Sequence, residues 1–217
     1  MRFYLSSYKM GNAVEKLKIL LPAANKRVAY ISNALDWSTD LARRERGEQS
    51  DLAQLQALGL GLEIEKLDLR EYFGKPGLLK QKVLEFGTIW VCGGNAFVLR
   101  HAMKLSGFDE LLRNLSATNA DMLYGGYSAG ICLLGPTLEG IDIVDPPSEK
   151  PYGDLKPVWD GLGILKFVIV PHFESNHPES EAAGKVAAYL KEHEISFRTL
   201  RDGEVIIIDD GMTTVSG

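Results

Sequence analysis

The sequence has 217 residues, a net charge of −5, 45% hydrophobic and 24% charged residues, values that are typical of a globular domain and exclude a disordered chain. Basic residues are scattered apart from Arg43–Arg46, which we expect on a solvated helix face, the N-terminus lacks a signal-peptide pattern, and no apolar run reaches the ~18 residues of a membrane span. We therefore expect a single cytoplasmic domain over residues 1–217, a monomer or homodimer with no nucleic-acid or membrane partner.

Short apolar runs alternate along the chain with segments in which apolar residues recur at i, i+3 and i+4. The runs predict strands at 2–7, 27–33, 62–69, 88–94, 121–128, 166–173 and 204–210. The other segments predict helices at 40–59, 77–87, 95–107, 108–120 and 177–194. This alternation predicts an α/β fold with a mainly parallel, doubly wound sheet between two layers of helices.

One segment, 135–163, breaks the alternation. It holds five of the nine prolines, and it shows neither the apolar runs of strands nor the i, i+3, i+4 spacing of helices. We expect a long irregular excursion there. Ligands of open α/β sheets bind outside the carboxyl ends of the strands. The residues that carry chemistry should therefore follow Val91, Gly126 and Val170.

A serine flanked by glycines follows one of these strands. Ser128 lies in the stretch GYSAG, Gly126–Gly130, which comes after a predicted strand and before a segment that can begin a helix. This context fits the G-x-S-x-G nucleophile elbow, in which the serine hydroxyl stands exposed at the edge of the sheet. The alternative is an ordinary strand-to-helix turn built from small residues.

A second glycine-rich turn, VCGGNAF, follows the preceding strand. Backbone N–H groups near Gly93 and Gly94 could bind an oxyanion together with the N–H of Ala129, and Asn95 is placed to cap the following helix. The alternative is a tight turn with no role in catalysis.

A serine nucleophile needs a base, and the chain offers four histidines. His172 lies at the carboxyl end of a predicted strand, on the same edge as Ser128, and we expect it to be the base. His177 precedes Pro178 at the start of a helix and is the reserve candidate. His101 and His193 fall inside helical segments, where exposed or packing roles are expected.

The acid that would orient the base is not determined by spacing. Six carboxylates remain open: Glu139, Asp142, Asp145, Glu174, Asp202 and Glu204. The two cysteines, Cys92 and Cys132, have no metal-ligand spacing and are expected to be reduced, buried thiols. We expect neither a metal nor a cofactor.

The motifs GGNAF, GYSAG, LLGPT, IVDP, VPHF and LRDG follow one another in this order. From about Arg27 to the C-terminus the chain thereby resembles the peptidase E (aspartyl dipeptidase) and cyanophycinase-like serine peptidase family. The resemblance implies a class I glutamine amidotransferase-like (flavodoxin-like) fold and metal-free hydrolysis of small peptides. It also implies Ser128 as nucleophile, His172 as base and Asp202 as acid, with Glu139 or Asp142 as alternative acids.

The segment after the histidine departs from that family, because it reads ESNHPESEAAGK and contains no arginine that could bind an aspartyl carboxylate. A preference for Asp-X dipeptides is therefore not expected. Two other functions stay open. An α/β-hydrolase esterase shares the elbow but places its histidine near the C-terminus, and a silent binding protein could keep the fold without the activity.

Overall fold

The computed structural model describes residues 1–217, and its centre is a seven-stranded sheet in the order β3-β2-β4-β5-β1-β8-β9. The first five strands in this order are parallel, and β8 and β9 are antiparallel to their neighbours. The strands of the sheet are β1 (Arg2–Ser6), β2 (Arg27–Ile31), β3 (Glu63–Lys66), β4 (Thr88–Val91), β5 (Leu123–Tyr127), β8 (Val205–Asp209) and β9 (Met212–Ser216). The predicted fold class, a three-layer and mainly parallel α/β sheet, is confirmed.

Seven α-helices connect or flank the strands. They are α1 (Val14–Leu20), α2 (Leu41–Gln56), α3 (Pro76–Val83), α4 (Ala96–Ser106), α5 (Phe108–Ala117), α6 (Ala129–Cys132) and α7 (Ser180–Glu192), with 3₁₀ turns η1 (Asn33–Leu35), η2 (Leu69–Tyr72) and η3 (Ile141–Ile143). The sequence analysis missed α1, β7 (Phe197–Thr199) and β9, and located the other long helices to within a few residues. None of these helices is both long and apolar enough to cross a membrane.

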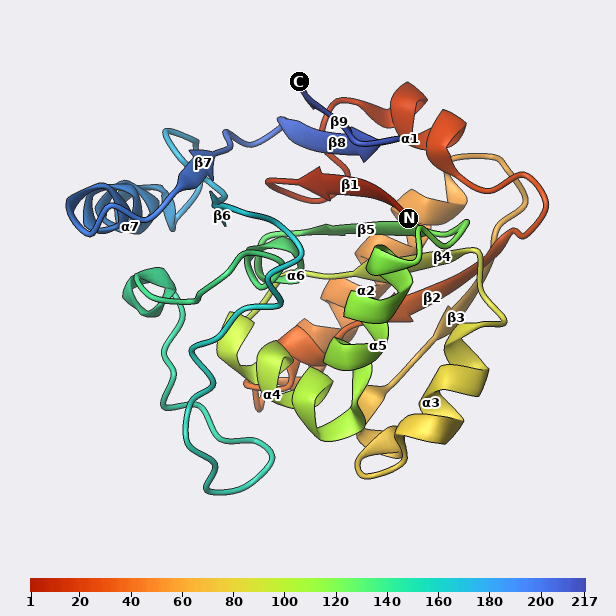
Figure 1. The fold of residues 1–217 in the computed structure, drawn as a ribbon, viewed down its shortest axis with the longest axis horizontal. Helices are drawn as coiled ribbons and strands as arrows, with labels where there is room; N and C mark the ends of the chain where they lie inside the picture. Colours follow the sequence, from red (N-terminus) through yellow and green to blue (C-terminus); the bar gives the residue numbers. More distant parts are fainter.

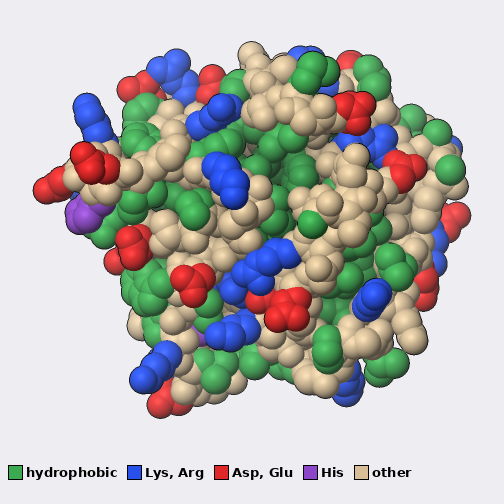
Figure 2. All heavy atoms as spheres, in the orientation of Figure 1, with side chains coloured by type: hydrophobic (Ala, Val, Ile, Leu, Met, Phe, Trp, Pro, Cys, Tyr) green, Lys and Arg blue, Asp and Glu red, His purple; other side chains and the backbone are tan.

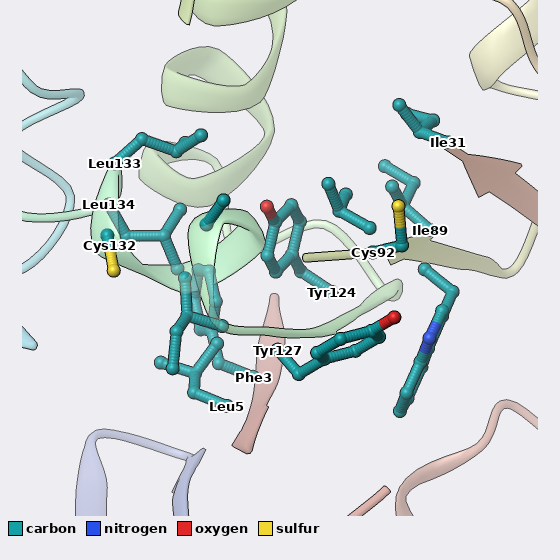
Figure 3. Packing of buried hydrophobic residues seen from close by; sticks show 14 of the residues in the cluster. Phe3, Leu5, Ile31, Ile89, Cys92, Tyr124, Tyr127, Cys132, Leu133 and Leu134 are labelled. Carbon is teal, nitrogen blue, oxygen red and sulfur yellow. The ribbon is translucent and has the colours of Figure 1, made fainter. Parts of the chain in front are cut away.

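Helices cover both faces of the sheet, with α3, α4 and α5 in front of it and α2 behind it in the view of Figure 1. Alternate side chains of the strands serve the two faces, as in Figure 3, where Tyr124 and Tyr127 point to opposite sides of β5. Tyr127 and Tyr30 both donate hydrogen bonds to the buried Asp51 of α2, at 2.8 and 2.9 Å. Buried hydrophobic side chains from Met1 to Ile207 form one contiguous cluster.

The strand predicted at 166–173 does not join the central sheet. Its ordered part, β6 (Val168–Val170), pairs in parallel with the short β7 (Phe197–Thr199) to form a separate two-stranded sheet. This small sheet lies beside α7 at the blue end of the colour scale in Figure 1, where β8 leads on into the central sheet. The apolar run was read correctly as a strand, but pairing partners depend on tertiary contacts that the run does not encode.

The segment 135–163 is irregular as predicted, with only η3 and one isolated bridge between Thr137 and Asp160. Part of it is anchored to the core, because Arg100 of α4 donates a hydrogen bond to the carbonyl of Asp160 at 2.8 Å. Acidic and basic side chains are intermixed on the face that Figure 2 displays, in keeping with the scattered charges of the sequence.

Candidate active site

Ser128 is the turn residue between β5 and α6, and its backbone is strained. Its φ of 50° and ψ of −121° lie in a region that few non-glycine residues adopt. A Cβ atom at Gly126 or at Gly130 would lie 2.5 Å from the carbonyl oxygen of Val91. The two glycines of GYSAG are therefore required because the elbow passes directly against the end of β4, and the side chain of Ser128 is left partly exposed.

The segment after Ser128 begins a helix, as expected, but the helix is short. Only Ala129–Cys132 are helical, and the chain then enters the irregular excursion. A macrodipole summed over four residues is small. Any stabilisation of an anion at this point must come from individual N–H groups, of which the first in a helix have no intrahelical acceptor.

The turn after β4 lies directly beside the serine. A Cβ atom added to Gly93 would lie 3.0 Å from the Cβ of Ser128, and Gly94 has a φ of 145° close to the carbonyl of Ala34. The side chain of Asn95 is occupied, because it accepts a hydrogen bond from the N–H of Val98 at 3.0 Å and donates one to the carbonyl of Pro146 at 2.9 Å. Asn95 therefore caps α4 rather than offering a free amide.

His172 follows β6 and is hydrogen-bonded to a carboxylate. Its Nδ1 lies 2.8 Å from Oδ1 of Asp202, which follows β7. The parallel register pairs Val170 with Thr199, so the residues after the two strands emerge side by side. Of the six acids left open by the sequence, Asp202 is the one that this register brings to the histidine.

Ser7, which directly follows β1, links this pair to the central sheet. Its Oγ accepts a hydrogen bond from the backbone N–H of His172 at 2.8 Å and donates one to Oδ1 of Asp202 at 2.9 Å. The backbone N–H of Asp202 donates to Oγ of Ser175 at 2.8 Å. These hydrogen bonds hold the backbone of His172 and both the backbone and the carboxylate of Asp202.

The surroundings of His172 favour its neutral form. Only 2% of the residue is exposed, and this burial, followed by the proximity of His177, lowers the pKa of the imidazole. Asp202 and Glu179 oppose the shift, and Oε2 of Glu179 lies 3.8 Å from Nε2 of His172. A neutral imidazole with Nδ1 bound to a carboxylate presents Nε2 as a proton acceptor.

Ser128, His172 and the turn Gly93–Asn95 line one cavity of about 560 Å³. The cavity walls also carry charges of both signs: Lys9, Arg43, Arg44, Asp145, Glu149 and Glu179. Arg44 is half-buried in an ion pair with the buried Asp36. Arg43 and Arg46 are exposed as predicted, but the expectation of a solvated face does not hold for Arg44.

Asp145 lies at the N-terminus of α4, where its Oδ2 accepts a hydrogen bond from the backbone N–H of Ala96 at 2.8 Å. Burial, with a smaller contribution from Glu179, raises the pKa of its carboxyl to about 7. It lines the cavity, but its hydrogen bond goes to the helix and not to the histidine. Cys132 and Cys92 are free and buried as predicted, and burial raises the pKa of both thiols.

The alternative acids Glu139 and Asp142 are not brought to the site. Both line a different hollow, next to Trp159 and Tyr189, and Oδ1 of Asp142 accepts a hydrogen bond from the N–H of Gly140 at 3.1 Å. The chain turns outward after Leu138, which exposes both side chains to solvent.

The remaining candidates are also engaged elsewhere. Glu174 pairs with Arg201, and Glu204 accepts a hydrogen bond from the backbone N–H of Arg201 at 2.7 Å. His101 is buried in α4 with its Nε2 2.9 Å from the carbonyl of Lys156, and His193 ends α7 away from the cavity. None of these groups faces Ser128.

Three side chains form the one group able to hold a metal ion. Ligand atoms of His172, His177 and Asp202 lie within 4.8 Å of one another. The two imidazoles are parallel, however, and Nδ1 of His172 already binds Asp202. Binding a cation there would break the hydrogen bond that orients the histidine.

The sequence analysis missed several residues of the cavity, among them Tyr8, Lys9, Trp37 and Glu179, and it also missed Ser7, which is hydrogen-bonded to His172 and Asp202. Ser7 and Tyr8 follow β1, a strand whose carboxyl end belongs to the same edge as that of β5. That position was an available signal. Glu179 lies near His172 only because the segment between β6 and β7 folds back onto the cavity. No pattern in the sequence predicts that arrangement.

A doubly wound α/β sheet with a glycine-flanked serine turn, next to a histidine held by a carboxylate, defines the class of serine hydrolases. The chain belongs to peptidase family S51, whose family model matches residues 5–216, and it is a serine-type peptidase. The resemblance to peptidase E stated from the motifs is confirmed.

Individual relatives agree with this assignment. The chain is 34% identical over 157 residues to a Listeria monocytogenes protein named "Uncharacterized peptidase Lmo0363", covering 68% of this chain and 71% of the relative. A crystal structure of a candidate peptidase E from Listeria monocytogenes EGD-e superposes with a TM-score of 0.77 at 26% identity, over 99% of this chain and 97% of that one. A peptidase from an acI-B1 Actinobacterium shares the fold, with a TM-score of 0.70 at 17% identity, over 100% and 87% of the two chains.

Proposed function

We propose that this chain hydrolyses the amide bonds of small peptides, as a dipeptidase does, through an acyl-enzyme on Ser128. One observation carries the proposal: a serine in a strained elbow and a histidine bound to a carboxylate line the same cavity. In a family of serine peptidases, this combination supports Ser128 as nucleophile, His172 as base and Asp202 as the orienting acid.

Acylation uses the neutral imidazole. Nε2 of His172 takes the proton of Ser128 Oγ while the oxygen attacks the carbonyl carbon of the scissile bond. The negative charge that forms on the carbonyl oxygen is bound by the N–H groups of Ala129 and Gly94. Asp202 holds the proton on Nδ1 and stabilises the imidazolium without being protonated.

Collapse of the tetrahedral intermediate breaks the C–N bond, and His172 returns its proton to the leaving amine. Water then attacks the ester of Ser128, with His172 accepting the water proton and passing it to Ser128 Oγ as the acid product leaves. Both half-reactions need the same base and the same oxyanion donors, so no metal is required.

The cavity favours short substrates. Its volume of about 560 Å³ is within the range of sites for small molecules. The irregular excursion contributes Val144, Pro146 and Glu149 to its wall, which limits the length of chain that can lie across Ser128. Charges of both signs on the walls suit a peptide that carries both an amine and a carboxylate.

A fluorophosphonate probe tests the nucleophile. We expect the wild type to be labelled at Ser128 and Ser128→Ala to remain unlabelled. Ser38 provides the matched control, because it lines the same cavity. Ser38→Ala should be labelled as fast as the wild type.

Substrate assays then separate the peptidase from its alternatives. A dipeptide and tripeptide library should be cleaved by the wild type and left intact by Ser128→Ala. Rapid turnover of short acyl esters without peptide cleavage would instead indicate an esterase. Binding without turnover, or labelling of Ser128→Ala, would contradict the proposed nucleophile.

A further inference from the structure

A second histidine lies flat against the proposed base. The ring centroids of His172 and His177 are 3.8 Å apart, and the angle between the ring planes is 9°. Tyr8 meets both rings edge-on, at centroid distances of 5.8 and 5.3 Å. One face of the His172 imidazole is therefore covered by His177, and Tyr8 closes the side of the stack.

The second ring is itself held in place. Nδ1 of His177 accepts a hydrogen bond from the backbone N–H of Glu179 at 3.2 Å, at the start of α7. In its neutral form, the proton of His177 therefore lies on Nε2. Its contact with His172 is between ring faces, so His177 is not a relay for the proton of His172.

The charged groups around His172 come from two segments. Asp202 lies in the turn between β7 and β8, Glu179 precedes α7, and His177 precedes Glu179. Tyr8, from the loop after β1, meets the ring edge-on, and Asp145 and Cys132 line a small pocket together with His172. Two carboxylates favour the imidazolium, whereas burial and a second imidazole oppose it, and the balance lowers the pKa of His172.

We propose that His177 is a positioning residue that holds the ring plane of His172 and, because two stacked imidazoles cannot both be charged, keeps His172 in its proton-accepting form. This inference rests on the proposed function. It assigns two separable effects to one side chain: a flat surface, which any aromatic ring could supply, and a latent positive charge, which only an ionisable group supplies.

Two variants separate these effects. His177→Phe retains a flat ring and removes the charge, while His177→Ala removes both. The matched control is His193→Phe, because His193 is also a stacked histidine, with its ring 3.9 Å from that of Tyr189 at the end of α7, outside the cavity. Circular dichroism confirms that each variant is folded.

The first readout does not depend on activity. The imidazoles of the four histidines are titrated by two-dimensional NMR in the wild type and in the variants. Removal of the neighbouring charge should raise the pKa of His172 by about one unit in both His177 variants, and not in His193→Phe. An unchanged pKa of His172 in both variants would overturn the electrostatic part of the proposal.

The second readout is the pH profile of labelling by the fluorophosphonate probe. Because the neutral imidazole is the base, a higher pKa moves the acid limb of the profile to higher pH, so labelling at pH 6 falls more than labelling at pH 8. At the plateau, His177→Phe should keep the wild-type rate and His177→Ala should lose about tenfold. Equal plateaus in all variants would overturn the positioning part.

The two readouts also separate this inference from the proposed function. If the wild type is never labelled at any pH, the proposed nucleophile fails, whereas the NMR titration still measures the coupling of the two imidazoles. If labelling is normal and neither the titration nor the profile changes in His177→Ala, then His177 is a packing residue and the inference fails alone.

Discussion

The backbone of Ser128 adopts a φ of 50° and a ψ of −121°, and such a conformation costs a non-glycine residue about 1–3 kcal/mol. The packing around it must offset that cost. Gly126 and Gly130 allow the close approach to β4, and the carbonyl of Ser128 accepts the N–H groups of Ile131 and Cys132 at 2.9 and 3.1 Å. The position of the hydroxyl is thus obtained at the expense of stability.

Replacing the serine by glycine should reveal this cost. Glycine reaches positive φ without strain, so we expect Ser128→Gly to exceed Ser128→Ala in free energy of unfolding by about 1 kcal/mol. Urea denaturation of the two inactive variants measures the difference. Equal stabilities, or a less stable glycine variant, would show that the elbow is not strained.

The assignment of Asp202 is testable with an isosteric change. Asp202→Asn keeps the shape of the side chain but loses the charge that holds the Nδ1 proton, so peptide turnover should fall by roughly 10³–10⁴-fold. Asp142→Asn and Glu139→Gln are the matched controls, since these side chains lie in another hollow. A large loss of turnover in either control, with Asp202→Asn still active, would show that the orienting acid is Asp142 or Glu139.

At the scale of elements, the turns after β4 and β5 are packed so closely that one of them has no room for a side chain. A Cβ atom at Gly93 would lie 2.8 Å from Cε2 of Tyr127 and 3.0 Å from Cβ of Ser128. The ring of Tyr127 is held against Gly93, because its hydroxyl donates a hydrogen bond to the buried Asp51. This contact sets the distance between the proposed oxyanion donors and Ser128, the proposed nucleophile.

Gly93→Ala should therefore push the two turns apart. We expect the rate of probe labelling at Ser128 to fall about tenfold or more, because small displacements of reacting groups are costly. Gly184→Ala in α7 is the control: nothing lies within 4 Å of its added Cβ, and alanine should stabilise the helix by about 0.5–1 kcal/mol. Unchanged labelling of Gly93→Ala would show that the turns move freely.

The elements also show which parts of the site a sequence can predict. Period and capping located α4 with Asn95 at its N-cap, and the strand before GYSAG located Ser128 at the edge of the sheet, because both signals are local. The partner of His172 depends on the pairing of β6 with β7, two strands of three residues each. No local pattern in such short runs specifies a partner, so six acids stayed open.

At the scale of the whole molecule, the half-buried carboxyl of Asp145 in the cavity wall makes the free energy of unfolding depend on pH. The pKa of Asp145 is raised to about 7 in the folded chain, against a value of about 4 when exposed in the unfolded chain. Between these values the folded state binds more protons. The contribution of Asp145 to the free energy of unfolding is therefore largest below pH 4 and is lost as the pH rises to about 7.

Asp145→Asn should remove this dependence while its amide oxygen still accepts the hydrogen bond from Ala96. The difference in free energy of unfolding between variant and wild type should be more favourable to the variant at pH 8.5 than at pH 5. We expect this change in the difference to be at least about 1 kcal/mol. Denaturant titrations at the two pH values measure the change. The comparison cancels the contribution of His172, which is common to both proteins, and a difference of opposite sign would contradict the raised pKa.

The site is assembled from two sheets that are not hydrogen-bonded to each other as strands. Ser128 belongs to the seven-stranded sheet, whereas His172 and Asp202 follow the two strands of the small β6–β7 sheet. The hydroxyl of Ser7 is bound to both members of that pair. Because no strand pairing joins the two sheets, the position of His172 and Asp202 relative to Ser128 depends on side-chain contacts such as those of Ser7.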